Sequence, residues 1–199
     1  MTEGPGSTGV ILIGGMSRRM GRDKLSLKIG GQTILNRVQV AVEAVCAETI
    51  FVGQGRLDPE KFSISDLRPD RAGPLAGIEA GLTAASHPLV FVAAGDLPFL
   101  NSDLVGDILS RLQTSSAAVP YHSGRPHPLC AAYRRDLLPE VTTALDGGVR
   151  AVRQFLNDIG GVDYVENLTA YGDPTVTLMN VNSPEDLARA RRIGAEELP

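Results

Sequence analysis

Cysteine is scarce in this sequence, and the two cysteines stand far apart. Cys46 and Cys130 form no Cys-x-x-Cys motif, and no secretory leader precedes them. Secreted domains that depend on disulfides carry more cysteines at closer spacing. We therefore expect two reduced thiols in a cytoplasmic protein.

Long apolar runs and an excess of basic residues are also missing. A membrane-spanning helix needs about 18 or more consecutive apolar residues. No stretch approaches that length, so we expect no membrane partner. Lysine and arginine number 19 against 23 acidic residues, which gives a formal net charge of −4 and a pI near 5.4. Nonspecific nucleic-acid binding uses a basic surface, so nucleic acid is excluded as a partner.

Histidine is rare, and its spacing does not suit a zinc site. The three histidines are His87, His122 and His127. The last two stand five residues apart in a Pro- and Gly-rich stretch, without a Cys or His cluster to complete a zinc ligand set. We expect no zinc there.

Two common phosphate-binding motifs are absent. The Walker motif needs Gly, four residues, then Gly-Lys and Ser or Thr, whereas Gly21 is followed by Arg-Asp-Lys. The dinucleotide fingerprint places glycines at its first, third and sixth positions, and here Gly14, Met16 and Arg19 occupy that spacing. A P-loop and a dinucleotide-binding loop are both excluded.

The chain is long enough for a single α/β domain spanning residues 1–199, of which residues 1–8 are polar and Gly-rich and are expected to be a flexible N-terminus. Short apolar runs alternate with helical patterns, which predicts a mostly parallel sheet with right-handed crossovers. The expected strands are 10–13, 49–52, 62–65, 89–94, 117–120, 130–133, 162–165 and 175–178. The expected helices include 136–145 and 149–159 and three others that begin after Thr33, at Pro74 and after Ser183.

The most informative stretch is residues 10–25. Four aliphatic residues at 10–13 predict a strand buried on both faces, and Gly14 and Gly15 end it. Successive glycines let backbone amides turn toward an anion. Four basic residues stand against one acidic residue over 14–24, which predicts a phosphate site at the carboxyl end of the strand. An Arg-rich surface loop is the alternative.

A second signal is Asp96, which follows strand 89–94 directly after Gly95. Carboxyl ends of parallel strands share one edge of a sheet, so this carboxylate should lie near the first loop. There it suits Mg²⁺, a hard ion commonly bound by one or two carboxylates and substrate phosphates. A turn or capping role is the alternative, but Pro98 argues against capping, and Ser102 is the better cap for the next helix.

Two further sequence motifs accompany the loop at 14–24 and Asp96. Gly73, Gly77 and Gly81 recur every fourth residue, which permits close approach of either a ligand or the sheet, and Pro74 suits the first turn of a helix whose free amides would lie beside Gly73. Near the end of the chain, Asn180 and Asn182 precede Ser183 and Pro184. In an extended segment the two asparagines point the same way. They could bind a phosphate, a pterin ring or a metal-bound water, or simply precede a helix.

Four motifs in order resemble those of the molybdenum cofactor guanylyltransferases. They are Leu12, Ile13, Gly14 and Gly15 followed by Arg19, Met20, Gly21, Asp23 and Lys24; Gly-Pro-Leu-Ala-Gly at 73–77; Gly-Asp-Leu-Pro at 95–98; and Asn-Val-Asn-Ser-Pro at 180–184. Ile13 departs from the family's usual Ala. The resemblance implies a three-layer α/β fold of the nucleotide-diphospho-sugar transferase type, which is Rossmann-like.

The resemblance also implies an activity. The enzyme would use Mg²⁺ to transfer GMP from GTP to molybdopterin or its molybdenum form and would release pyrophosphate. A small GTP-binding accessory protein and acceptor molybdoenzymes would be its protein partners. Both reactants are anionic, so positioning and charge neutralisation are the main catalytic tasks.

The implied site residues fall into four groups. The catalytic residues would be Lys24, Arg19 and Asp96. The nucleotide-binding residues would be Leu12, Ile13, Gly14, Gly15, Lys24, Asp66, Gly73 and Asp96, where Asp66 stands seven positions before the first glycine of its motif, as the family's acidic residue does. Asp96 would bind the metal. His127, in a His-Pro position similar to the family's substrate-side loop, and Asn180 and Asn182 would contact the pterin substrate.

Two alternatives remain open. Related cytidylyltransferases share the glycine-arginine loop, so a CTP-dependent molybdopterin cytidylyltransferase is the nearest alternative. From a different class, the chain could be a non-catalytic nucleotide-binding protein that carries the cofactor. Preferential binding of CTP over GTP would favour the first, and absence of pyrophosphate release the second.

Overall fold

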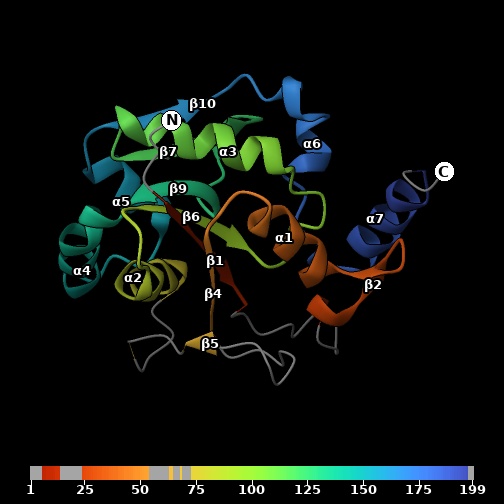
Figure 1. The fold of residues 1–199 in the computed structure, drawn as a ribbon, viewed down its shortest axis with the longest axis horizontal. Helices are drawn as coiled ribbons and strands as arrows, with labels where there is room; N and C mark the ends of the chain where they lie inside the picture. Colours follow the sequence, from red (N-terminus) through yellow and green to blue (C-terminus); the bar gives the residue numbers. More distant parts are fainter. Residues whose placement is uncertain (1–5, 14–23, 54–62, 65–67, 69–72, 197–199) are drawn as a thin grey trace.

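A computed structural model describes residues 6–13, 24–53, 63–64, 68 and 73–196. In this part of the chain, a central sheet of eight strands is flanked by helices (Figure 1). Seven strands follow the order β10-β7-β9-β6-β1-β4-β5, and β8 pairs with β7. Their bounds are β1 Ser7–Leu12, β4 Glu48–Val52, β5 Ser63–Ile64, β6 Leu89–Ala94, β7 Ala117–His122, β8 Arg125–Pro126, β9 Cys130–Arg134 and β10 Val162–Val165.

The direction of the strands confirms the expected mostly parallel sheet. Strand β1 is parallel to β4 and β6, β4 is parallel to β5, and β7 is parallel to β10. Strand β9 is antiparallel to both its neighbours, β6 and β7. A separate hairpin pairs β2 (Lys28–Ile29) with β3 (Gln32–Thr33) through Gly30 and Gly31, which both have positive φ.

The helices and 3₁₀ turns lie between these strands. The helices are α1 Ile34–Glu43, α2 Pro74–Ala84, α3 Ser102–Ser110, α4 Leu138–Asp146, α5 Val152–Asp158, α6 Pro174–Thr177 and α7 Pro184–Glu196; the turns are η1 Lys24–Ser26, η2 Arg111–Gln113, η3 Arg135–Leu137 and η4 Thr169–Tyr171. No helix among the described residues is long and apolar enough to cross a membrane.

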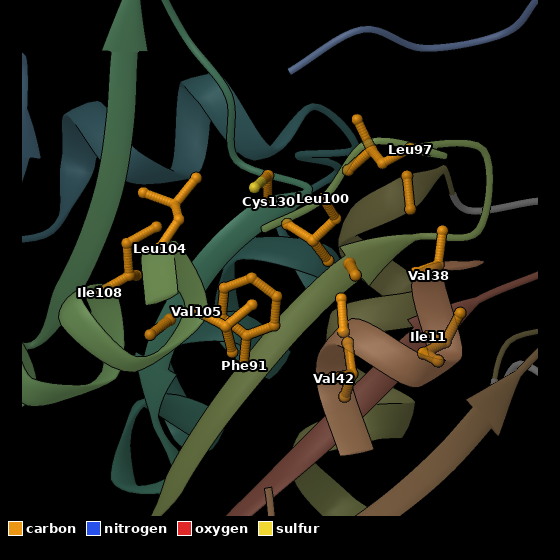
Figure 2. Close-up of a cluster of buried hydrophobic side chains, with 14 of the residues drawn as sticks. Ile11, Val38, Val42, Phe91, Leu97, Leu100, Leu104, Val105, Ile108 and Cys130 are labelled. Carbon is orange, nitrogen blue, oxygen red and sulfur yellow. The ribbon is translucent and has the colours of Figure 1, made fainter. Parts of the chain in front are cut away.

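Side chains of the strands alternate between two cores. Ile11 and Phe91 face α1 and α3, where they pack with Val38, Val42 and Leu104 (Figure 2). Their neighbours in sequence, including Val10, Val90 and Val92, face the opposite way and pack with α2, α4 and α5. The apolar run at 10–13 is therefore buried on both faces, as predicted. Three layers result, helices over sheet over helices.

Several helix starts follow from short polar side chains, as predicted. The Thr33 hydroxyl accepts a hydrogen bond from the Asn36 amide at 3.1 Å, and Pro74 is the first residue of α2. At α7, the Asp186 amide donates to Ser183 Oγ at 3.1 Å and Asp186 Oδ2 accepts from the Ser183 amide at 2.9 Å. This reciprocal arrangement is a capping box.

Three predictions of local structure are wrong. The flexible N-terminus does not extend to residue 8, because Ser7 and Thr8 belong to β1 and are buried. The N-cap of α3 is Asn101 rather than Ser102, because the Asn101 side-chain oxygen accepts from the amides of Asp103 and Leu104 at 2.7 and 3.2 Å. Residues 175–178 do not form a strand. Asp173 caps a single helical turn there with Pro174 in the first position, and this start signal outweighs the β-branched residues that suggested a strand.

The predicted helices 136–145 and 149–159 are present with shifted starts. A 3₁₀ turn occupies 135–137 before α4, and α5 begins at Val152. Both cysteines are free thiols, as predicted, and burial raises the pKa of Cys46 to about 11 and that of Cys130 to about 12.

Candidate active site

The carboxyl ends of β1 and β6 are in direct contact. The Gly95 amide, one residue past β6, donates to the Leu12 carbonyl at the end of β1 at 2.9 Å. A Cβ at position 95 would lie 3.1 Å from that carbonyl oxygen and 3.4 Å from Leu25 Cδ1. Glycine therefore lets the chain after β6 lie tightly against both β1 and η1. The same contact places Lys24 beside Asp96.

Lys24 and Asp96 form an ion pair across this junction. Lys24 Nζ lies 2.5 Å from Asp96 Oδ2, and the two side chains are 18% and 12% exposed. Lys24 Nζ also donates to Asn182 Oδ1 at 2.8 Å, across 158 positions of sequence. An ammonium has three N–H donors. Among the partners that the structure describes, two of the three are engaged, so one can meet a phosphate oxygen.

The segment from Asn180 to Asn182 also holds the carboxylate of Asp96. Asn180 Nδ2 donates to Asp96 Oδ1 at 2.7 Å, and the Val181 amide donates to the Asp96 carbonyl at 3.0 Å. Both carboxylate oxygens thus have a partner, so the orientation of the Asp96 side chain is fixed.

Packing explains why both asparagines reach the site. Met179 and Val181 are 8% and 0% exposed and belong to a third apolar cluster, which also contains Ile29, Ile34, Phe99 and Ala190. Alternate residues of an extended segment point in opposite directions. Burial of Met179 and Val181 therefore turns Asn180 and Asn182 toward Lys24 and Asp96. The two asparagines point the same way, as predicted.

Gly73 occupies the start of α2 in a conformation that favours glycine. Its φ is +76°, and an added Cβ would lie 2.9 Å from the Arg150 carbonyl oxygen. No side chain caps this helix end among the described residues. Of the amides predicted to be free beside Gly73, that of Ala76 donates to the Gly73 carbonyl at 3.2 Å. Gly77 and Gly81 instead allow α2 to approach the sheet, since added Cβ atoms would lie 3.1 Å from Leu12 and 2.7 Å from Val10.

His127 lies in the loop before β9. Its amide donates to the Pro120 carbonyl at 2.8 Å, and the loop borders the end of β6, where the Ala94 amide donates to the Leu129 carbonyl at 2.7 Å. The buried Nε2 atom has no partner among the described residues. Burial, and then electrostatic interaction with Arg125 and His122, lower the pKa of His127 to about 4. The imidazole is therefore neutral near pH 7.

The other predicted site residues divide into two groups. Leu12 ends β1, and Ile13 is buried, with its amide donating to the Val52 carbonyl at 2.8 Å. Gly14, Gly15, Arg19 and Asp66 lie outside the described residues. The structure thus brings together Lys24, Asp96, Asn180 and Asn182, and it places Leu12 next to them through Gly95.

The donor set fits a metal ion that arrives with its substrate. No group of three or more His, Cys, Asp or Glu residues that could hold a metal is present in the described ranges. The Asp96 carboxylate is a hard oxygen donor at the junction, and Mg²⁺ commonly takes one or two carboxylates, substrate phosphates and water. The described residues therefore suit Mg²⁺ bound together with phosphate rather than a preformed protein cage.

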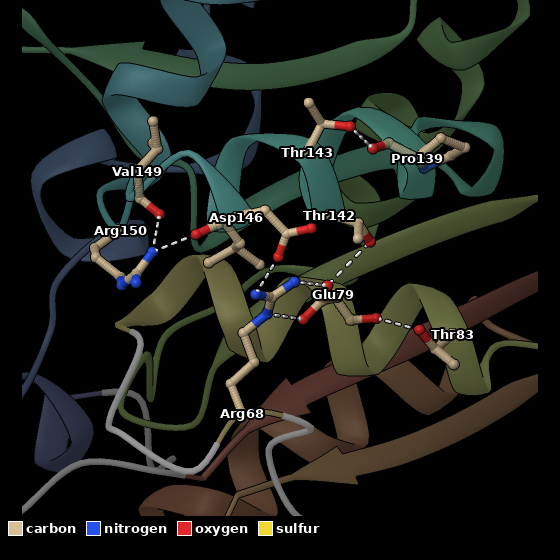
Figure 3. A network of polar contacts seen from close by, with 10 residues as sticks. Arg68, Glu79, Thr83, Pro139, Thr142, Thr143, Asp146, Val149 and Arg150 are labelled. Atoms are coloured by element: carbon tan, nitrogen blue, oxygen red, sulfur yellow. Dashed lines mark hydrogen bonds and ion pairs between the residues drawn. The ribbon is translucent and has the colours of Figure 1, made fainter.

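The pairing of Glu79 with Arg68 was not predicted from the sequence (Figure 3). Glu79 is 4% exposed in α2, and every other residue from Leu75 to Leu82 is apolar or glycine. A single carboxylate within an apolar, glycine-rich helix was the available signal, because a buried charge requires a partner.

Comparison with known proteins identifies the family to which the chain is similar. A family model described as the MobA-like NTP transferase domain matches residues 9–161. A molybdenum cofactor guanylyltransferase of Nitrobacter hamburgensis is 36% identical over 210 residues, covering 97% of both chains. A molybdenum cofactor guanylyltransferase of Desulfosudis oleivorans is 32% identical over 189 residues, covering 92% of this chain and 93% of the relative.

Solved structures show the same fold. The molybdopterin-guanine dinucleotide biosynthesis protein A of Archaeoglobus fulgidus aligns with a TM-score of 0.79 and 26% identity, covering 95% of this chain and 99% of that chain. The 2-C-methyl-D-erythritol 4-phosphate cytidylyltransferase of Thermus thermophilus aligns with a TM-score of 0.70 and 25% identity, covering 94% and 98%. These neighbours confirm the nucleotide-diphospho-sugar transferase type of fold.

Proposed function

The chain belongs to the MobA-like NTP transferase family, and on that premise we propose that it is a molybdenum cofactor guanylyltransferase. It would transfer GMP from GTP to molybdopterin or its molybdenum form and release pyrophosphate. The observation that carries the proposal is the Lys24–Asp96 pair, at 2.5 Å, where the chain after β1 meets the chain after β6. Relatives that bear this activity in their names match almost the whole chain.

The reaction needs charge neutralisation more than covalent chemistry. A phosphate oxygen of molybdopterin attacks the α-phosphorus of GTP, and the bond from that phosphorus to the bridging oxygen of pyrophosphate breaks. Negative charge develops on the α-phosphoryl oxygens and on the departing pyrophosphate. Lys24 offers an ammonium donor at this place, and a preorganised donor of this kind stabilises such charge without reorganisation.

Asp96 would hold Mg²⁺ together with the phosphates of GTP. When bound, the ion would neutralise phosphate charge and act as a Lewis acid. Asn180 keeps the Asp96 carboxylate oriented through its hydrogen bond at 2.7 Å. Asn182 holds the Lys24 ammonium at 2.8 Å. Both asparagines therefore serve this pair in the free protein, and their predicted contact with the pterin stays a proposal.

The remaining nucleotide contacts rest on the motifs. We propose that Arg19 and the amides of Gly14 and Gly15 bind the triphosphate, that Leu12 and Ile13 lead the chain to it, and that the start of α2 at Gly73 faces the nucleotide. Guanine offers N1–H and N2–H₂ donors, which a carboxylate can accept together, so Asp66 is assigned to the base. This pairing would select GTP over ATP.

The contact with the pterin substrate and the partner proteins are also proposed on the premise of family membership. His127 is proposed to contact molybdopterin, since its neutral ring can donate or accept one hydrogen bond. A small GTP-binding accessory protein and acceptor molybdoenzymes would work with the enzyme in the cytoplasm. Nucleic acid is not a partner in the proposed reaction.

The decisive experiment follows the transferred nucleotide. Purified protein is incubated with Mg²⁺, molybdopterin and GTP labelled at the α-phosphate. Transfer of label to molybdopterin with equimolar release of pyrophosphate is expected, and omission of Mg²⁺ should stop both. Hydrolysis of GTP without labelled molybdopterin would contradict the proposal, and so would the absence of pyrophosphate, which is the expected result for a non-catalytic carrier.

A CTP-dependent reaction is the second candidate, because the similar Thermus thermophilus structure is a cytidylyltransferase. Thermal stability in the presence of each nucleotide distinguishes the two. A ligand at a hundred times its dissociation constant stabilises the folded state by about 2.7 kcal/mol. GTP should give this stabilisation at lower concentration than CTP or ATP. The reverse order for CTP would replace the guanylyltransferase assignment with the cytidylyltransferase one.

A further inference from the structure

The loop that follows Asp96 is buried against α1. Every residue from Leu97 to Leu100 is buried. Leu97 and Leu100 belong to the apolar cluster that includes Val38 of α1 (Figure 2). Buried backbone carbonyls need hydrogen-bond donors, because leaving one unpaired is costly. The carbonyl of the buried Pro98 in this loop therefore requires a partner.

Arg37 of α1 is that partner. Its Nε donates to the Pro98 carbonyl at 2.7 Å, and its Cζ lies 5.2 Å from the centre of the Phe99 ring. A guanidinium above an aromatic ring is attracted by the negative face of the ring. One side chain of α1 thus contacts two consecutive residues of the buried loop.

The backbone around Asp96 is held from three directions. The amide of Gly95 donates to the last carbonyl of β1 at 2.9 Å, and the Asp96 carbonyl accepts from the Val181 amide at 3.0 Å. Pro98 follows two residues later, and its carbonyl is the atom that Arg37 holds. Hydrogen bonds therefore join this stretch to β1, to the chain before α7 and to α1.

The contact from Arg37 fixes an orientation that apolar packing does not. The hydrophobic effect is non-directional, so Leu97 and Leu100 hold the loop against α1 without orienting its peptide groups. A hydrogen bond does have a preferred direction. Proline fixes its own φ and restricts the residue before it, so little freedom remains between the Pro98 carbonyl and Asp96. The direction of that carbonyl is therefore passed on to the carboxylate.

We propose that Arg37 is a positioning residue for Asp96: by holding the Pro98 carbonyl, it keeps the carboxylate where it can bind a divalent cation together with the phosphates of GTP. The inference rests on the proposed function, which assigns Mg²⁺ to Asp96. Arg37 acts through the loop. Loss of a group that orients a metal ligand typically costs about 10- to 100-fold in metal affinity or activity.

The test compares two variants that both lose the charge of Arg37. In Arg37→Gln, the side-chain nitrogen stands as many bonds from Cα as the arginine Nε and can donate to Pro98. Arg37→Met has a side chain of the same length without a donor. Mn²⁺ binding in the presence of GTP is followed by the electron paramagnetic resonance of the free ion, with molybdopterin left out so that no transfer occurs. We expect Arg37→Met to weaken Mn²⁺ binding about tenfold and Arg37→Gln to remain close to wild type.

Two further measurements should follow the same order. Arg37→Met should need about tenfold more Mg²⁺ for half-maximal guanylyl transfer, and excess Mg²⁺ should restore most of the rate. A mere loss of stability would not respond to the ion in this way. Hydrogen exchange of the Gly95 and Val181 amides, which hold this stretch in place, should be faster in Arg37→Met than in Arg37→Gln.

Arg135→Met is the matched control. Arg135 Nε also donates to a backbone carbonyl, that of Leu82, at 3.3 Å. The Arg135 amide donates to the Pro88 carbonyl at 2.8 Å, just before the amino end of β6, whereas Asp96 follows the carboxyl end of that strand. Arg135→Met should leave Mn²⁺ binding unchanged. Equal losses in Arg135→Met and Arg37→Met would show a general effect of lost stability and would overturn the inference.

Other outcomes separate this inference from the proposed function. Wild-type Mn²⁺ binding by a folded Arg37→Met variant refutes the positioning role alone, and so does an equal loss in Arg37→Met and Arg37→Gln, which would assign the effect to the missing charge. If Arg37→Met does not fold, Arg37→Ala replaces it, since alanine lacks a donor and favours helix. If wild type transfers no GMP, the proposed function fails, while the exchange of the Gly95 and Val181 amides still tests whether Arg37 fixes the loop.

Discussion

Two ion pairs of similar exposure have different surroundings in this protein. Lys24–Asp96 and Arg68–Glu79 have N–O distances of 2.5 and 2.7 Å, with cations that are 18% and 24% exposed and anions that are 12% and 6% exposed. A lysine ammonium is a point charge with rotatable donors, whereas an arginine guanidinium is a rigid fork. The first pair is suited to changing partners and the second to fixing a position.

The neighbours of each pair support this distinction. Lys24 and Asp96 lie where the chain leaves two parallel strands, and they contact the side-chain amides of Asn180 and Asn182. A phosphate or a cation can replace such contacts without exposing apolar surface. Glu79 instead lies among the buried residues of α2 and has the Thr142 hydroxyl as its additional partner. Burial therefore does not by itself distinguish the two pairs, whereas location at the strand ends does.

The largest expected effect is on catalysis. Asp96→Ala should lower the rate of guanylyl transfer by about 10²–10³, which is typical for loss of one charge-stabilising group in a preorganised site. The fold should persist because Asp96 lies past the end of β6, outside the apolar cores. Pyrophosphate release measures the rate, and circular dichroism checks the fold. Asp107→Ala, which removes a carboxylate that accepts a hydrogen bond from Arg111 Nε at 2.9 Å, is the control and should keep wild-type activity. A folded, fully active Asp96→Ala would remove the metal assignment.

A second prediction compares the contributions of the same two ion pairs to stability, where the Arg68–Glu79 pair should have the larger effect. Arg68→Met should lower the free energy of unfolding more than Lys24→Met, because it leaves the Glu79 carboxylate inside α2 without its cation. Asp96 in the Lys24 variant keeps its hydrogen bond from Asn180 and stands closer to solvent. Urea unfolding of both variants gives the two differences. Equal losses, or a larger loss for Lys24→Met, would contradict the assignment of a fixed role to the Arg68–Glu79 pair.

A smaller effect is expected at the start of α2. Gly73→Ala should lower the free energy of unfolding by about 1–3 kcal/mol for backbone strain at positive φ, and further because its Cβ would lie 2.9 Å from the Arg150 carbonyl oxygen. Gly124→Ala is the matched control, since Gly124 has φ +75° and open space around the added Cβ. Chemical unfolding should therefore rank Gly73→Ala below Gly124→Ala in stability. The opposite order would show that the Arg150 carbonyl moves away from an added Cβ at little cost in free energy.

The last prediction is a pH dependence outside both ion pairs. His127 has a native pKa of about 4, while the ordinary value is 6.5. As the pH falls from about 6.5 to 4, the unfolded chain takes up a proton that the native protein excludes, so the free energy of unfolding should decrease. His127→Gln should flatten this part of the profile, measured by urea unfolding at several pH values. An unchanged slope would place the titration elsewhere.

Much of the fold could be predicted from local pattern. The run at 10–13 and the strand at 89–94 are apolar throughout, and only a sheet covered on both faces buries such segments. Capping chemistry predicted the starts of α1, α2 and α7. It misplaced the cap of α3 by one residue, because Asn101 and Ser102 are both suitable caps and only the backbone conformation selects between them.

The candidate site was predictable in part. Parallel strands end at one edge, so the meeting of Lys24 and Asp96 followed from the assignment of their strands and is confirmed by their ion pair. The roles of these residues, and of Gly14, Gly15, Arg19 and Asp66, remain predictions. The side-chain amides of Asn180 and Asn182 were open to several partners, and the structure places them on this pair.

The sequence by itself determined the alternation of strands and helices, the glycines that permit close contacts and the charged residues at the strand ends, because these depend on neighbours a few positions away. Only the tertiary structure decided which distant side chains meet, such as Lys24 with Asn182 or Arg68 with Glu79 and Asp146. Such contacts depend on how helices and loops pack around the sheet, and that packing is a collective result of three apolar clusters rather than of any local pattern.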